Sequence, residues 1–209
     1  MGDMTATDNY RVLLSGGEGE IVEKKSRFIS TIRKCETEEE AVAFIEEMKK
    51  KYWDARHNCS AFIIGSRGEL TRCSDDGEPS GTAGRPMLEV LTGSGIRNIA
   101  VVVTRYFGGT LLGTGGLVRA YQDSVRENLS TLVLAEQVPL AHLGLTLEYA
   151  HLDGLRRLLP TFEARITDED YQATAGLGVS LPEEHLAAFL KAVAGMSNGA
   201  AVCRVREDG

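Results

Sequence analysis

The chain has few of the features that mark a specialised class of protein. It contains no run of about 18 apolar residues, so we expect no membrane-spanning helix, and acids stand where a secretory signal would carry positive charge. Its four cysteines show no C-x-x-C spacing, which predicts reduced thiols in a cytoplasmic protein. Basic residues do not predominate, because the net charge is −7, and this disfavours a general polyanion binder. The 209 residues suit one large or two small domains.

Apolar periodicity predicts a first domain over residues 1–133. Its firmest element is a helix after Thr37, because Glu40 three residues on completes a capping box and apolar residues follow at helical spacing. Pro86 stands where a helix favours its first residue, and a further helix follows Gly116. Strands are expected over 20–24, 27–33, 58–64, 69–73 and 99–104, the last with both faces covered because it is almost continuously apolar.

Residues 134–209 predict a second domain with the element order β-α-β-β-α-β, which is the ferredoxin-like arrangement. Two of its strands, over 162–167 and 171–179, are expected to flank an acidic turn at residues 168–170, and Pro182 is expected to open its second helix. The fold class predicted for the whole chain is therefore α+β in two domains.

An unusual stretch, CSDDGEPSGTAGRP over residues 73–86, concentrates acids and glycines between apolar segments. Asp75, Asp76 and Glu78 could hold Mg²⁺, pair with Arg85 or Arg105, or take part in acid–base chemistry. A metal site combining His57, Cys59 and Cys73 is a weaker alternative to two small buried cysteines on neighbouring strands. We therefore predict no bound metal and no cofactor.

A second glycine-rich stretch, RYFGGTLLGTGG over residues 105–116, joins the buried strand to the next helix. Unpaired backbone N–H groups at a helix N-terminus attract anions, and phosphate is the obvious guest. The P-loop pattern fails because Leu117 follows Gly116, and the dinucleotide pattern fails because Val118 stands where a glycine is needed. The competing interpretation is that these glycines permit positive φ and close packing.

Together, the segments SDDGEPSGTAG (74–84) and TRYFGGTLLG (104–113) resemble the signature of the YigZ/IMPACT family, and the continuation GGLVRAY (115–121) agrees with it. The resemblance implies a first domain of the βαβ type found in domain IV of elongation factor G, followed by the ferredoxin-like domain of bacterial members. It also implies a link to translation, because eukaryotic relatives regulate initiation. It assigns no catalytic role to any residue.

We predict a non-catalytic binding module that contacts the ribosome, RNA or a translation-associated protein and has no membrane partner. Arg85, Arg105 and Arg119 would supply guanidinium donors, and Tyr106 and Phe107 a stacking surface. The alternative is an enzyme that acts on a phosphorylated small molecule or nucleotide with Mg²⁺ on the acidic loop. The predicted binding cleft comprises Asp75, Asp76, Glu78, Ser80, Thr82, Arg85, Arg105, Tyr106, Phe107, Gly108, Gly109, Gly113, Gly115, Gly116 and Arg119.

Overall fold

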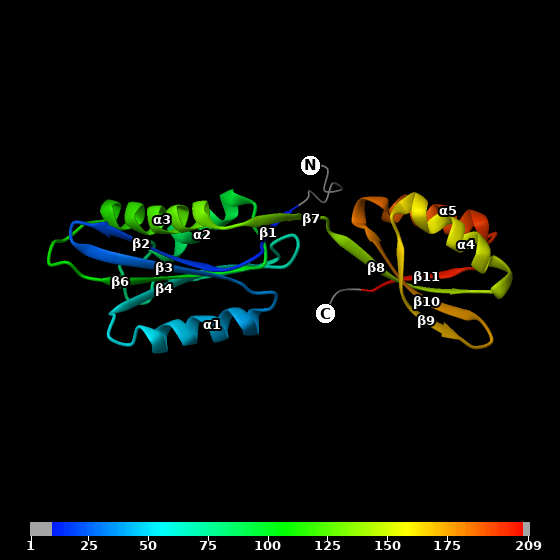
Figure 1. Ribbon diagram of the computed structural model, residues 1–209, viewed down its shortest axis with the longest axis horizontal. Helices are drawn as coiled ribbons and strands as arrows, with labels where there is room; N and C mark the ends of the chain where they lie inside the picture. The colour runs from blue at the N-terminus through cyan, green and yellow to red at the C-terminus, as the bar shows by residue number, and fades with distance from the viewer. Residues whose placement is uncertain (1–9, 207–209) are drawn as a thin grey trace. The chain divides into compact units, whose positions relative to one another are not determined.

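The computed structural model describes residues 10–206. Chain contacts divide these into an N-terminal unit, residues 10–137, and a C-terminal unit, residues 138–206. Each unit combines a β-sheet with helices, so the α+β class predicted from the sequence is confirmed (Figure 1). Within the described residues, no helix is both long and apolar enough to cross a membrane.

The N-terminal unit is built on a five-stranded antiparallel sheet in the order β2-β3-β6-β4-β5. The central strand β6 is buried along nearly its whole length, as its apolar run predicted, because helices cover both faces of the sheet. Figure 1 shows α1 on one face and α2 with α3 on the other. The strands are β2 (Gly17–Glu23), β3 (Ser26–Lys34), β4 (His57–Ile64), β5 (Leu70–Ser74) and β6 (Ile99–Tyr106).

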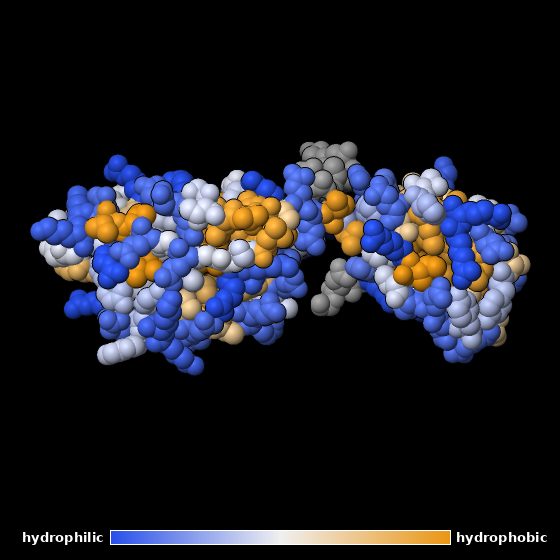
Figure 2. Space-filling model, in the orientation of Figure 1, coloured by the Kyte–Doolittle hydropathy of each residue, from blue (hydrophilic) through white to orange (hydrophobic). Residues whose placement is uncertain are grey.

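Two hydrophobic cores hold the helices to this sheet. Phe44 and Met48 of α1 (Glu38–Lys51) pack on one face, whereas α2 (Gly84–Ser94) and α3 (Thr114–Thr131) enclose the other with residues such as Met87 and Tyr121. The predicted start of α1 is confirmed, because the Thr37 hydroxyl accepts a hydrogen bond from the Glu40 N–H at 3.2 Å. In Figure 2, hydrophobic side chains also gather at the surface along the α2 and α3 side.

A two-stranded ribbon of β1 (Tyr10–Leu13) and β7 (Leu134–Gln137) completes the N-terminal unit. The sequence did not predict this pairing, because each strand is only four residues long and the partners lie far apart in the chain. A boundary after residue 133 would separate β7 from its partner.

The C-terminal unit has the predicted element order and the sheet order β11-β8-β10-β9, which is the ferredoxin-like topology. Its helices are α4 (Leu152–Leu158) and α5 (Leu186–Met196), and its core gathers around Leu143, Leu177 and Phe189. The strands are β8 (Leu140–Leu147), β9 (Arg165–Tyr171), β10 (Ala175–Pro182) and β11 (Val202–Arg206).

Two sequence predictions in this unit are wrong in detail. The acids 168–170 lie inside β9 rather than in a turn, and the chain reverses further on, where the Gln172 N–H donates to the Thr174 carbonyl. An exposed edge strand tolerates charged side chains, so their charge was a poor indicator of a turn. Pro182 ends β10, and a 3₁₀ turn separates it from α5. In the N-terminal unit, one proline prediction is also wrong in detail, because Pro86 is the third residue of α2, not the first.

Candidate functional site

One end of the five-stranded sheet carries four loops, which we call the loop end: residues 24–25, 52–56, 75–83 and 107–113. The strand register brings them together, because Arg27 pairs with Tyr106 and His57 with Arg105 where β6 ends. The N-termini of α2 and α3 follow two of these loops. The ribbon of β1 and β7 lies at the opposite end of the unit (Figure 1). Both glycine-rich stretches therefore reach the same end of the fold.

A buried ion pair joins the two stretches. The Arg105 guanidinium lies 2.7 Å from Glu78 Oε1, and the two side chains are 8% and 3% exposed. The Tyr121 hydroxyl donates to the same carboxylate oxygen at 2.8 Å. The Arg105 guanidinium also lies over the rings of Phe28 and Phe107. Of the three acids that the sequence offered as ion-pair partners, Glu78 is the one that pairs with Arg105, and this pair joins the 75–83 loop to the end of β6.

The Cys59 thiol extends this buried network. Its sulfur lies 3.0 Å from the Asp75 carbonyl oxygen and 3.3 Å from the Tyr121 hydroxyl. Burial raises the pKa of both the Cys59 thiol and the Tyr121 hydroxyl, so both groups remain protonated at neutral pH. A protonated, fully buried thiol is a packing group rather than a nucleophile.

Asp75 shapes the acidic loop from within. Its carboxylate accepts hydrogen bonds from the backbone N–H groups of Gly81, Ala83 and Gly84 at 2.8, 3.0 and 2.8 Å. Burial alone would raise the pKa of Asp75, but these three N–H donors outweigh it and lower the pKa below its ordinary value. Because Ala83 and Gly84 begin α2, Asp75 caps that helix from a distance.

Asp76 is also engaged by the fold. Its carboxylate accepts the Asn58 N–H at 2.7 Å, and its own carbonyl oxygen lies 2.9 Å from His57 Nδ1. Within residues 10–206, no three His, Cys, Asp or Glu side chains gather as ligands for a cation. Cys59 is buried as expected, but Cys73 is exposed, which corrects the prediction that both would be buried.

The glycines of the second stretch play two different roles. Gly108 is required for packing, because a Cβ there would overlap the backbone of Lys25 and Ser26. Gly109 and Gly113 have φ of 86° and 74°, a conformation that side chains disfavour, and both face open space. Gly113 precedes α3 without a side-chain cap, and the helix then continues through Gly115 and Gly116. The first N–H groups of α3 therefore lack intrahelical partners.

The remaining predicted residues divide by exposure. Thr82 is buried and donates its hydroxyl to the Pro79 carbonyl at 2.6 Å, whereas Ser80 is exposed. Arg85 is exposed and pairs with Glu89 at 3.3 Å. Arg119 is exposed, and its Nε donates to the Gly115 carbonyl at 3.3 Å, which places the side chain beside the first turn of α3.

The two aromatic residues differ as well. Tyr106 is half-buried and donates its hydroxyl to Asp54 at 2.7 Å, whereas Phe107 is 54% exposed. Sequence reasoning missed Trp53, the only tryptophan, which is 80% exposed in the 52–56 loop. The sequence held one signal of this exposure: Trp53 follows the lysine-rich end of α1, where the helical spacing of apolar residues stops.

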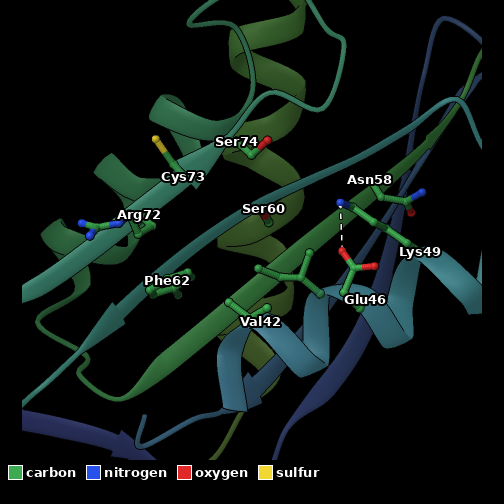
Figure 3. A pocket seen from close by; sticks show the side chains of 10 residues that line it. Val42, Glu46, Lys49, Asn58, Ser60, Phe62, Arg72, Cys73 and Ser74 are labelled. Atoms are coloured by element: carbon green, nitrogen blue, oxygen red, sulfur yellow. Dashed lines mark hydrogen bonds and ion pairs between the residues drawn. The ribbon is translucent and has the colours of Figure 1, made fainter. Parts of the chain in front are cut away.

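A separate cavity of about 250 Å³ lies on the face of the sheet that α1 covers, between α1 and strands β4 and β5 (Figure 3). Val42 and Phe62 contribute apolar walls, and Glu46 pairs with Lys49 at 3.2 Å beside it. None of the predicted cleft residues lines this cavity. It is therefore distinct from the loop end.

The domain content of the chain decides its family. Residues 24–129 match the Impact N-terminal domain, and residues 145–200 match a domain of unknown function (DUF1949). The chain belongs to the IMPACT family. The family prediction is thereby confirmed, and every residue of the predicted cleft lies in the matched Impact N-terminal domain.

Relatives of this IMPACT-family chain cover most of its length. It is 44% identical to "IMPACT family member YigZ" of Escherichia coli (strain K12), over 84% of this chain and 87% of that protein. It is 39% identical to "IMPACT family member YvyE" of Bacillus subtilis (strain 168), over 91% and 88%. A solved structure described as "Crystal structure of an hypothetical protein" matches with a TM-score of 0.68 and 39% identity, over 96% of this chain and 98% of that one.

Proposed function

We propose that this IMPACT-family chain is a non-catalytic binding module that acts in translation and contacts RNA, free or in the ribosome, through the loop end. The resemblance to eukaryotic regulators of initiation supports the link to translation. The distribution of charge at the loop end supports RNA as the contacted molecule. The roles of the individual cleft residues below belong to this proposal.

The single observation that carries the proposal is that the three acids of the 75–83 loop are all engaged by protein donors. Asp75 and Asp76 accept backbone hydrogen bonds, and Glu78 is paired with Arg105 in the interior. Arg105 compensates the charge of Glu78, and the backbone donors orient the carboxylates of Asp75 and Asp76 toward the loop without neutralising them. Among the exposed charged residues of these loops, Lys24, Lys25 and Arg56 are positive and Asp54 is negative, although the whole chain carries −7.

The exposed cations are positioned at some conformational cost. Lys24 and Lys25 form the β2–β3 turn with φ of 47° and 68°, where Asn or Gly is usual. The left-handed conformation costs a non-glycine residue about 1–2 kcal/mol. Both lysines are exposed, and neither has an ion-pair partner among residues 10–206. Two lysines retained in a strained turn are suited to contact phosphate.

The backbone adds donors to these cations. Gly109 and Gly113 face open space, so a phosphate could approach the first N–H groups of α3 closely. Arg119 lies beside the same turn. The alternative, a Mg²⁺-dependent enzyme, has weaker support because Asp75, Asp76 and Glu78 already have protein partners.

The test is salt-dependent binding. Purified chain is sedimented with ribosomes and, separately, titrated with RNA over a series of salt concentrations. A Lys24→Glu, Lys25→Glu variant should bind less tightly and should lower the slope of log K against log salt by about one for each phosphate that the protein no longer neutralises. The matched control is Arg157→Glu, Lys191→Glu, which changes the same charge at exposed positions of the C-terminal unit. Equal binding by both variants would refute the loop end as the contact surface.

Arg105→Ala is unsuitable for this test. Its guanidinium is buried against Glu78, so the variant would lose stability before it reported on binding. Arg119→Ala is the better single substitution, since the side chain is exposed and donates a hydrogen bond to the Gly115 carbonyl of its own helix.

A further inference from the structure

We propose that the loop end binds single-stranded RNA by stacking unpaired bases on Trp53 and Phe107. This inference rests on the proposed function, which it narrows from RNA in general to one structural class. It adds a residue, Trp53, that the family resemblance did not point to.

The exposure of Trp53 is the first observation. Tryptophan is among the most buried residue types on average, yet this one is 80% exposed. It follows α1 directly, where Tyr52 is held by a hydrogen bond from its hydroxyl to Glu18 at 2.9 Å. The residue before Trp53 is therefore anchored while its own indole ring remains available.

A hydrogen bond links the loop of Trp53 to that of Phe107. The Tyr106 hydroxyl donates to Asp54 Oδ1 at 2.7 Å, so the residue after Trp53 is joined to the residue before Phe107. The Arg27 guanidinium lies 5.6 Å from the Tyr106 ring centroid and supports it from β3. The two exposed aromatics therefore project from loops that are fixed to one another. Because the two loops are joined, binding a base has to order little more than the side chains themselves, which limits the loss of conformational entropy.

Cations flank both rings. Gly108 packs against the backbone of Lys25, and its N–H donates to Ser26 Oγ at 3.1 Å, so the lysine turn lies against the loop of Phe107. Arg56 is exposed three residues after Trp53, and no ion pair joins it to the rest of residues 10–206. Aromatic rings interleaved with unpaired cations are the pattern that binds single strands, in which bases stack while phosphates follow the positive groups.

The same pattern argues against a duplex. Bases in an RNA helix are already stacked and paired, so their faces are inaccessible to Trp53 and Phe107. A protein partner would use an apolar centre with a polar rim, whereas here the exposed rings alternate with lysines and arginine. Unpaired RNA is the occupant that uses both kinds of group.

The sole tryptophan makes the test direct. Intact chain is titrated at low salt with a mixed-sequence 12-nucleotide RNA that cannot self-pair, and with the duplex made from the same strand. We expect the single strand to quench Trp53 fluorescence and to bind at least about tenfold more tightly than the duplex. Trp53→Ala and Phe107→Ala should each weaken single-strand binding about tenfold, measured by anisotropy of labelled RNA. Trp53→Phe should retain most of the affinity. Tyr149→Ala, an exposed aromatic of the C-terminal unit, is the matched control.

The outcomes separate the two proposals. Equal affinity for both RNAs, unchanged by Trp53→Ala but reduced in the Lys24→Glu, Lys25→Glu variant, would overturn base stacking and leave the RNA-binding function standing. No binding of either RNA by the unsubstituted chain would overturn both, and the exposed rings would then be assigned to a protein contact.

Discussion

The buried pair between Glu78 and Arg105 should be a sensitive point of the N-terminal unit. Arg105→Ala removes a guanidinium that lies 2.7 Å from a carboxylate with only 3% of its side chain exposed. What remains is a buried negative charge whose one described side-chain donor is the Tyr121 hydroxyl. Neither water nor another cation reaches it readily, so the cost is the desolvation of an uncompensated charge.

The expected magnitude follows from that geometry. Removing one partner of a buried pair costs about 3–5 kcal/mol. Tyr121→Phe, which removes one hydrogen bond to the charged Glu78, should cost about 1.5–3 kcal/mol. Replacing both charges, as Glu78→Leu with Arg105→Met, removes the unpaired charge and should recover much of the loss, because buried pairs are often matched by apolar residues of similar volume.

The measurement is urea unfolding followed by far-UV circular dichroism. Hydrogen exchange of β6 peptides locates the change in the N-terminal unit. Domains are typically stable by about 5–15 kcal/mol, so a loss of about 3–5 kcal/mol should be unmistakable. An Arg105→Ala variant within about 1 kcal/mol of the parent would refute the assigned desolvation cost, as would a double substitution less stable than Arg105→Ala alone.

Three further predictions concern single residues. Asp75→Asn should lower the free energy of unfolding by about 0.5–2 kcal/mol at pH 7. The pKa of Asp75 in the folded chain lies below its ordinary value, so the stability that its carboxylate contributes is complete above the ordinary value and is lost as pH falls through the folded pKa. Urea melts of the parent and the variant should therefore converge on acidification. Gly108→Ala should lower the melting temperature markedly, since its Cβ meets backbone, whereas Gly115→Ala, which meets nothing within 4 Å, should raise stability by about 0.5–1 kcal/mol; equal effects would contradict the packing argument. Cys73 should react with a thiol reagent in the native chain at pH 8, because it is exposed. Cys35 is buried, and burial raises the pKa of its thiol to about 11, so it should react only on unfolding. Labelling of the native and the unfolded chain, with the modified peptides identified, tests both expectations.

Local patterns were sufficient for most of the architecture. The capping box at Thr37 and the apolar run of β6 each specify an element through interactions within a few residues or through uniform burial. The pairing of β1 with β7 was not accessible in this way, because its partners are distant in the chain and each strand is too short to show a period. The turn between β9 and β10 was misplaced because it lacks Gly and Pro, whereas the acids on the edge strand imitated a turn.

The candidate site, like the fold, was predictable from local sequence only in part. The sequence alone determined the family, the α+β class and the two segments that reach the loop end, since these depend on residue types and their spacing. Only the tertiary structure decided that Asp75, Asp76 and Glu78 turn inward while Lys24 and Trp53 remain exposed. The reason is physical: a carboxylate takes whichever donors the fold brings near it. Asp75 finds its donors within its own stretch once that stretch is folded, whereas the donors to Asp76 and Glu78, Asn58 and Arg105, come from other strands.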